Sequence, residues 1–243
     1  MRVLFVVAPL LASLVIVPAA LAEPYIGLYL TGVPSSEHDT KTDRTLLDTG
    51  ATERFTTKDT KFKGSVVYGG LVGYRFLPFL AAEIDAYHLN PGPKGQTQTA
   101  TGPTIGPLQV TIKSGDLDLT ILALQLVGSH GLMRNTQHPD GQLHLYGGAG
   151  LAIIFASIDT QVTSPNATLP LRDSTTQLGP QVKGGARWFF TKNLAAFVEG
   201  RYAHAELEFT DTGVSNAGSP VRLKSESDLN LPLVLVGVSW FFR

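Results

Sequence analysis

The sequence predicts an all-β fold, an eight-stranded antiparallel up-and-down transmembrane β-barrel. Three observations support this prediction. The chain begins with an export signal, it contains eight stretches in which apolar residues alternate with polar residues or glycine, and the connections between these stretches are alternately long and short. A period of two is typical of strands, and alternating loop length is typical of outer-membrane barrels.

Residues 1–22 have the pattern of a secretory signal peptide. One basic residue, Arg2, precedes a long apolar run that ends at Ala22 in an A-x-A cleavage pattern. A membrane-anchoring helix is the alternative, but it needs about 20 apolar residues, and two prolines interrupt this run. We therefore expect cleavage after Ala22, followed by a single β-barrel domain over residues 23–243.

The composition of the chain excludes several classes of function. Arg2 is the one charged residue of the signal, so 18 of the 19 Lys and Arg remain against all 20 Asp and Glu. This near-neutral balance gives no electrostatic basis for binding nucleic acid. The absence of Cys excludes disulfides, thiolate metal sites and Cys nucleophiles. The six histidines have no metal-binding spacing, so we expect no metal and no cofactor.

Eight stretches rich in β-branched and aromatic residues are predicted to be strands. They cover residues 24–33, 62–76, 80–90, 115–132, 142–160, 175–191, 194–210 and 228–242. In the third stretch, Leu80 and Ile84 share one face, while Glu83 and Asp85 share the other. A helix would instead place apolar residues three and four positions apart. The pattern therefore favours strands.

The connections between these stretches differ in length in a regular way. Segments rich in Thr, Ser, Asp, Gly, Pro and Lys are predicted to be long exposed loops, at 34–61, 91–114, 161–174 and 211–227. Shorter turns lie between them, at 77–79, 133–141 and 192–193. All long loops then leave the same end of the barrel, as extracellular loops do. Loop 34–61 is the largest candidate contact surface for an extracellular ligand.

The face of the strands that carries charge is predicted to line the lumen. Alternation alone leaves open a soluble barrel with an apolar interior. However, the charged face also carries many glycines, and an eight-stranded barrel is narrow enough for paired side chains to fill it. The predicted lumen ion-pair network consists of Arg75, Glu83, Asp85, Asp118, Lys183, Arg187, Glu199 and Arg201. We expect this network to plug the barrel, with a narrow pore as the alternative.

Aromatic residues gather at the ends of strands on the short-turn side. Such girdles lie at membrane–water interfaces. The predicted girdle consists of Tyr74, Phe76, Trp188, Phe190, Trp240 and Phe242. The last strand also has an unbroken apolar face, and only Arg243 follows Phe242.

At this point the chain resembles the small outer-membrane β-barrel family that includes opacity-protein-like porins and the transmembrane domain of outer membrane protein A. The matching segments are EPYIGLYLTG, GGLVGYRF, LAAEIDAY, LYGGAGLA, GARWFFTKNLAAFVEGRY and VGVSWFF, and the resemblance covers nearly all of the chain after residue 22. It implies a location in the outer membrane of a Gram-negative cell, contact with outer-membrane lipids and lipopolysaccharide, and assembly by the barrel-assembly machinery through the C-terminal strand. Because family members act as adhesins, membrane–wall links, immune-evasion factors or pores, the resemblance implies fold and location more than activity.

The expected role is therefore structural or surface interaction through the extracellular loops, without enzyme activity. One enzymatic alternative comes from His204, which has outward parity and resembles the histidine of lipid A deacylases, eight-stranded barrels with a Ser-His-Glu site. In those enzymes a Ser lies two residues after the His, whereas Glu206 has that position here. Either a β-bulge near Tyr202 reverses the register, or these polar residues lie above the hydrocarbon layer.

Overall fold

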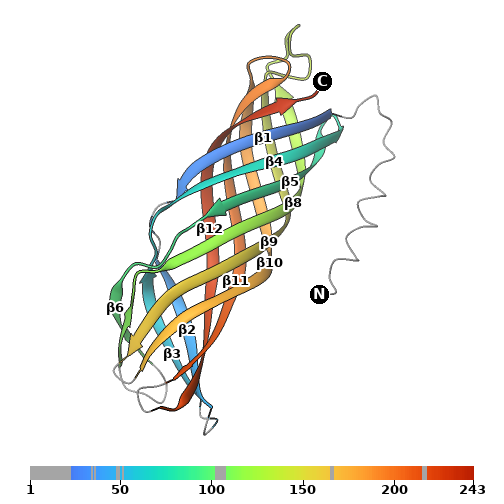
Figure 1. Ribbon diagram of the computed structural model, residues 1–243. Coiled ribbons are helices and arrows are strands. Elements are labelled where there is room, and N and C mark those ends of the chain that lie inside the picture. The colour runs from blue at the N-terminus through green and yellow to red at the C-terminus, as the bar shows by residue number, and fades with distance from the viewer. Residues whose placement is uncertain are drawn as a thin grey trace.

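The computed structural model describes residues 23–33, 35, 37–47, 50, 52–101, 108–164, 167–214 and 218–243. The predicted signal peptide lies outside these residues, so its cleavage stays a prediction. The described chain forms one tall antiparallel β-structure (Figure 1). Among the described residues, no helix is long and apolar enough to span a membrane.

Eight strands close into a ring, which confirms the predicted eight-stranded barrel. They are β1 (Glu23–Val33), β4 (Ser65–Leu77), β5 (Leu80–Leu89), β8 (Asp116–Leu132), β9 (Leu143–Ser164), β10 (Ala167–Phe189), β11 (Leu194–Val214) and β12 (Pro220–Phe241). The strands follow one another around the ring in this order, and antiparallel pairing of β1 with β12 closes it. We call this closed part the membrane ring.

Four further strands build a second tier beyond the membrane ring, at the end away from the C-terminus. They are β2 (Glu37–Leu46), β3 (Thr52–Lys61), β6 (Gln96–Ala100) and β7 (Leu108–Ile112). β2 pairs with β12, and β7 pairs with β9. Reciprocal backbone hydrogen bonds between Thr56 and Thr101 join β3 to the end of β6. In Figure 1 this surface tier lies at the opposite end from the C-terminus.

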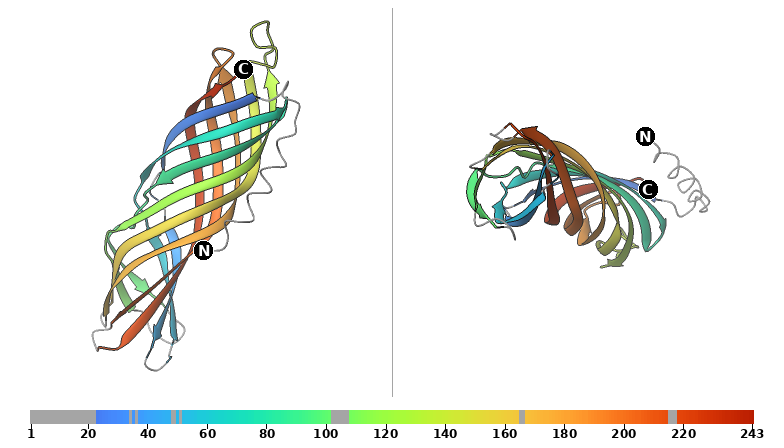
Figure 2. Two further views of the ribbon diagram at one scale, coloured as in Figure 1. Left: turned by 45° about the vertical axis from the view of Figure 1, so that its right-hand side comes forward. Right: turned by 90° about the horizontal axis from the view of Figure 1, so that it is seen from below.

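The prediction of long exposed loops was therefore wrong for much of these segments. The 34–61 segment contains the β2–β3 hairpin, 91–114 contains β6 and β7, and 161–174 and 211–227 largely continue β9 to β12. Backbone ladders satisfy N–H and C=O groups whatever the side chains are. A Thr-rich, charged strand can consequently form without the apolar alternation that identifies a membrane strand. Figure 2 shows the long yellow-to-red strands running through both tiers.

The outward face of the membrane ring carries a continuous apolar band. On β12 the outward residues Val234, Val236, Val238 and Trp240 are all exposed. The band runs from Pro232 to Phe242, which agrees with the about 9–11 residues that a tilted strand needs to cross a bilayer. On the N-terminal side of Pro232, the outward residues of β12 are polar, beginning with Asn230 and Asp228. The band marks the part of the barrel that lipid surrounds, and the surface tier lies outside it.

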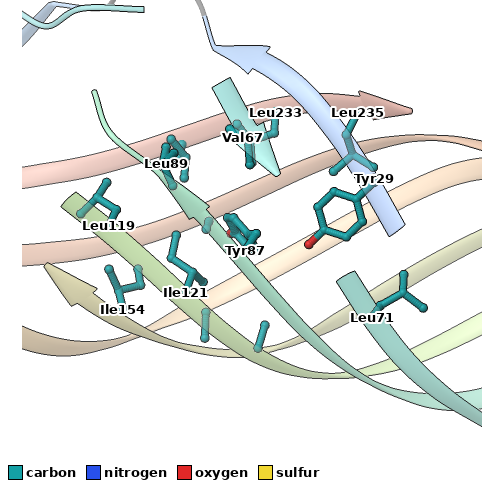
Figure 3. Close-up of a cluster of buried hydrophobic side chains, with 14 of the residues drawn as sticks. Tyr29, Val67, Leu71, Tyr87, Leu89, Leu119, Ile121, Ile154, Leu233 and Leu235 are labelled. Atoms are coloured by element: carbon teal, nitrogen blue, oxygen red, sulfur yellow. The ribbon is translucent and has the colours of Figure 1, made fainter. Parts of the chain in front are cut away.

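The lumen of the membrane ring also contains an aliphatic layer that the sequence analysis did not predict (Figure 3). Val67 and Leu71 of β4 point inward and are buried. They belong to one core with Leu89, Ile121 and Ile154. The expected filling of glycines and ion pairs is thus only part of the interior, because aliphatic side chains occupy the lumen next to it.

Candidate functional site

A buried cluster of charges crosses the lumen of the membrane ring. Its three carboxylates are Glu83 and Asp85 on β5 and Glu199 on β11, and all are buried. Each accepts a hydrogen bond from a tyrosine hydroxyl: Glu83 from Tyr25, Asp85 from Tyr29, and Glu199 from Tyr146 at 3.0 Å. The inward parity of strands far apart in sequence brings these groups together.

Lys183 on β10 and Arg201 on β11 neutralise these carboxylates; both reach across the lumen to β5, and Arg201 also pairs with Glu199 of its own strand. The Nζ atom of Lys183 pairs with Glu83 and lies 3.5 Å from a Glu199 oxygen and 3.8 Å from an Asp85 oxygen. The Nη2 atom of Arg201 donates to both Asp85 and Glu199 at 2.6 Å. Charges taken out of water need this degree of pairing, because an unpaired buried ion costs several kcal/mol.

Arg187 extends the cluster toward the short-turn end of the barrel. Its Nη2 atom lies 3.7 Å from Glu83, and its guanidinium stands 5.1 Å from the ring centroids of both Tyr25 and Phe241. Tyr25 in turn stacks on Phe241 at 4.6 Å. Cation–π contacts of this kind stabilise an arginine where little water reaches it. The short-turn end of the lumen, here called its floor, is thus closed by the rings of Tyr25 and Phe241 and the guanidinium of Arg187.

The structure brings together six of the eight residues of the predicted network, all except Arg75 and Asp118. Arg75 is buried as well, but its partner is Glu23 at 2.8 Å, near the same end of the barrel. For Asp118 the prediction was wrong. Leu117 and Leu119 occupy the inward positions of β8, so Asp118 is exposed, where its Oδ1 accepts from Asn90 at 2.9 Å.

The predicted aromatic girdle lies at the short-turn end as a set of mostly outward side chains. Trp188, Phe190, Trp240 and Phe242 are all exposed, and Tyr74 is also exposed. Phe76 differs because the β4–β5 register shifts between Arg75 and Leu77, and its side chain is half-buried. Five of the six predicted girdle residues thus face outward at this end, and their place at the membrane–water interface stays a prediction.

His204 and Glu206 point outward because β11 and β12 pair without a register shift. A bulge near Tyr202 is thus excluded, and both residues lie just beyond the apolar band. The Nδ1 atom of His204 lies 3.1 Å from the amide oxygen of Asn230, which also accepts from the Tyr202 hydroxyl at 2.6 Å. Among the described residues, His204 makes no hydrogen bond to a serine.

The surface tier carries its own exposed ion pairs. The guanidinium of Arg54 on β3 makes a two-pronged contact with Asp43 on β2, with both nitrogen–oxygen distances at 2.6 Å. This hydrogen bonding holds the pKa of the Asp43 carboxyl below its usual value. Lys224 on β12 lies 2.9 Å from both Glu208 and Glu226. Exposed pairs stabilise weakly, so these contacts align strands more than they hold them together.

A cavity of about 170 Å³ lies inside the barrel where the two tiers meet. It is lined mainly by aliphatic side chains, among them Ile158, Leu171, Leu207 and Leu229. Sequence reasoning missed this cavity. The sequence held one indication of the cavity. On β11 and β12, inward residues such as Leu207 and Leu229 stay apolar beyond the membrane band, where the outward residues are already polar.

Comparison with known proteins agrees with this architecture. The family model for the outer membrane protein β-barrel domain matches residues 6–242. The chain therefore belongs to this family, and it is an outer-membrane protein of the Gram-negative type. No curated protein sequence matches it.

Solved structures of small outer-membrane barrels are similar to the chain. OprG from Pseudomonas aeruginosa aligns with a TM-score of 0.56 and 16% identity, covering 92% of this chain and 97% of that one. Neisserial surface protein A aligns with a TM-score of 0.43 and 15% identity, covering 89% and 96%. At this identity the likeness to OprG shows the fold alone.

Proposed function

We propose that this protein is a non-conducting barrel of the outer membrane that acts through its surface tier, in a structural or surface-interaction role. The observation that carries the proposal is the buried charge cluster around Glu83, Lys183 and Arg201, which crosses a narrow lumen. Ions moving through this lumen would have to displace paired, dehydrated charges. The aliphatic layer beside the cluster adds a second barrier without polar groups.

The surface tier supports the second half of the proposal. A β-hairpin that is paired to β12 and bridged to β6 is held in place by backbone pairing, unlike a flexible loop. Its exposed faces carry both signs of charge, as the Asp43–Arg54 pair illustrates. Such a surface suits a polar extracellular ligand or lipopolysaccharide headgroups. Assembly through the C-terminal strand fits the same scheme, since the Phe242 N–H donates to the Pro24 carbonyl at the closing seam.

Conductance in planar bilayers tests the plug directly. Purified protein is expected to give no steady channels, and Asp118→Asn, which alters an exposed charge outside the lumen, serves as the matched control. Reproducible single-channel steps that change in Lys183→Met would establish the pore alternative instead.

Adhesion tests the surface role. The protein would be displayed on a non-adherent Gram-negative host, beside a variant in which residues 37–61 are replaced by a short Gly-Ser turn. Binding of cells to matrix proteins or to host cells is expected to fall in the variant, provided that its heat-modifiable gel shift shows a folded barrel. Equal binding by both strains would remove this hairpin from the contact surface.

A separate assay tests for lipid hydrolysis, because this activity would not depend on the surface tier. Incubation with lipopolysaccharide is expected to release no fatty acid. Release that disappears in His204→Ala would overturn the assignment of a non-enzymatic role.

A further inference from the structure

The outer wall of the surface tier contains a second pocket, which is polar and has a volume of about 240 Å³. One side of it is the connection between β7 and β8, and the other side is the paired part of β9 and β10 beyond the apolar band. The lining consists of Lys113, Ser114, Asp159, Thr160, Gln161, Pro170 and Arg172. Unlike the cavity inside the barrel, this pocket therefore presents charges, hydroxyls and an amide.

β9 and β10 supply a block of four side chains on the outward face. Asp159 pairs directly with Arg172 across the two strands, and Gln161 pairs with Pro170. Residues two positions apart on a strand share a face, so these four side chains lie together. The intervening Leu171 is buried and points inward. The block thus forms one wall of the pocket on the outside of the barrel.

The β7–β8 connection forms the other wall and is fixed to β9. The Lys113 N–H donates to the Gln161 carbonyl at 2.8 Å, and the Thr160 hydroxyl donates to the Lys113 carbonyl at 2.8 Å. Gly115 packs so closely on β9 that a Cβ atom at this position would stand 2.7 Å from the Cβ atom of Thr160. Only a residue without a side chain allows this approach. The two walls are therefore held at a fixed separation.

The pocket lies where headgroups and extracellular solutes reach the barrel. On β9 the outward Phe155 is exposed and belongs to the apolar band, whereas the next outward residues, Ser157 and Asp159, are polar. Gln161 follows Phe155 by six residues, which places it about 20 Å further along the strand at about 3.3 Å per residue. A ligand consequently enters the pocket from water or from the headgroup layer.

The side chains of the pocket offer mainly unused donors. Arg172 is held through its Nε atom, which lies 3.0 Å from Asp159, and its Nη atoms donate to no acceptor in the described part of the chain. The ammonium group of Lys113 has no ion-pair partner among the described residues. The side chains of Ser114 and Gln161 likewise make no hydrogen bond within the described ranges. Such a set is complementary to a ligand rich in acceptors.

Two further lysines stand beside the pocket. The Nζ atom of Lys63 donates to the Gly115 carbonyl at 3.2 Å. Lys94 is exposed, and it follows the residue whose carbonyl accepts from the Gly115 N–H. Asp116 partly offsets their charge, since it lies directly opposite Asp159 across β8 and β9. An anion in the pocket is thus met by cations of both walls, while Asp159 is already engaged by its arginine.

Phosphate is the anionic group that this geometry fits best. A guanidinium presents parallel N–H groups to two phosphate oxygens, and an ammonium adds a point charge that a third oxygen can accept from. The Gln161 amide and the ring of Pro170, directly opposite each other, offer hydroxyl groups a partner and a sugar ring a small apolar surface. The pocket therefore has separate places for a phosphate and for a sugar.

We propose that this pocket binds a phosphorylated sugar, with the phosphate between Lys113 and Arg172 and the ring against Gln161 and Pro170. The sugar phosphate is either a free solute or the headgroup of an outer-leaflet glycolipid. This inference gives the surface tier a ligand and so rests on the proposed surface role. The β2–β3 hairpin contributes no residue to the pocket, so the adhesion test of that hairpin and the test of this pocket can fail independently.

Calorimetric titration of the full barrel in phosphatidylcholine nanodiscs tests the proposal. The probe is glucose 6-phosphate, and glucose is its uncharged counterpart. We expect saturable binding of the sugar phosphate that is at least about tenfold tighter than that of glucose, because charge-assisted hydrogen bonds are the stronger ones. Equal affinity for the two sugars would overturn the proposal.

Lys113→Gln and Arg172→Gln are each expected to weaken binding of glucose 6-phosphate about tenfold, as the loss of one hydrogen-bonding cation predicts. Arg222→Gln is the matched control, because it removes the same charge from an exposed position on another side of the surface tier. A heat-modifiable gel shift confirms that each variant is folded. An equal loss in Arg222→Gln and Lys113→Gln would show general attraction of anions instead of a pocket, and would overturn the proposal.

Nanodiscs that contain lipid A distinguish the two sources of the sugar phosphate. If the occupant is a membrane headgroup, diphosphorylated lipid A in the disc is expected to weaken binding of glucose 6-phosphate, and dephosphorylated lipid A is not. Unchanged affinity in both discs would assign the pocket to a free sugar phosphate. Equal weakening by both lipids would show that the lipid surface blocks the pocket without occupying its phosphate site, and would exclude the glycolipid.

Discussion

Gly73 lies directly under the ring of Tyr25. A Cβ atom built at Gly73 would stand 2.1 Å from the Cζ atom of that ring, far inside van der Waals contact. The same relationship recurs at Gly69, where a Cβ would stand 2.7 Å from Cζ of Tyr29. These glycines of β4 make the space in which two tyrosines reach across the lumen to Glu83 and Asp85. The charge cluster thus depends on the absence of side chains on the neighbouring strand.

Gly73→Ala is therefore expected to destabilise the barrel. Overpacking of a tight core costs about 1–3 kcal/mol and sometimes more, and here the ring cannot move without breaking its hydrogen bond to Glu83. Urea unfolding in lipid vesicles measures the effect. Gly128→Ala is the matched control, because its nearest neighbours would stand 3.9 Å from the new Cβ. Equal midpoints for the two variants would contradict the packing argument.

Lys183→Met is expected to lower the free energy of unfolding by about 3–5 kcal/mol, because it leaves Glu83 buried without its cation. The double variant Lys183→Met/Glu83→Gln is expected to lose less than the sum of the single changes, since it removes both charges of the pair. Asp118→Asn, at an exposed position, is expected to stay within about 0.5 kcal/mol of the parent. Additive losses at Lys183 and Glu83 would show that the two residues do not act as a pair.

Phe242→Ala is expected to reduce the fraction of protein assembled in the outer membrane, measured by the heat-modifiable gel shift of membrane extracts. Phe242 is exposed at the girdle and its backbone pairs with β1. Arg243→Ala is expected to have a smaller effect. The Arg243 guanidinium contacts Glu23 and lies 5.1 Å from the Phe189 ring centroid, so its loss affects only the rim of the floor. The reverse ranking would assign the assembly signal to the terminal charge.

Protection of the β2–β3 hairpin is expected to fall in acid. The pKa of Asp43 in the folded chain is lowered by Arg54, so the pair stabilises the hairpin above the unfolded pKa of about 3.9. That contribution is lost as the pH falls through the folded value. Amide exchange of residues 41–45 between pH 6 and pH 3 measures it. In Asp43→Asn this component of the pH response should be absent, and an unchanged response would assign it to other carboxylates.

Alternation was sufficient to predict the membrane ring from the sequence. Lipid outside and packed side chains inside force a period of two on every strand, so β5 was identified from residues such as Glu83 and Ile84 alone. The same parity predicted which charges would converge in the lumen. The assumption that charged residues face the lumen failed at Asp118. This residue lies near the end of the apolar band, where an outward charge is hydrated.

The surface tier and the cavity could not be predicted in the same way. The outer faces of surface-tier strands such as β2 and β3 contact water and need no apolar residues. Their Thr-rich sequences are also typical of loops. The cavity where the two tiers meet depends on which strands pair, over stretches far apart in sequence.

Half of the wall, β9 to β12, passes without a break from the membrane ring into the surface tier, whereas the other half changes strands where the tiers meet. A load applied to the exposed tier is therefore carried toward the membrane along two hydrogen-bonded pairs of strands, β9 with β10 and β11 with β12. The half of the wall in which the strands change has no such continuous ladder, so bending of one tier against the other is expected to occur toward that side.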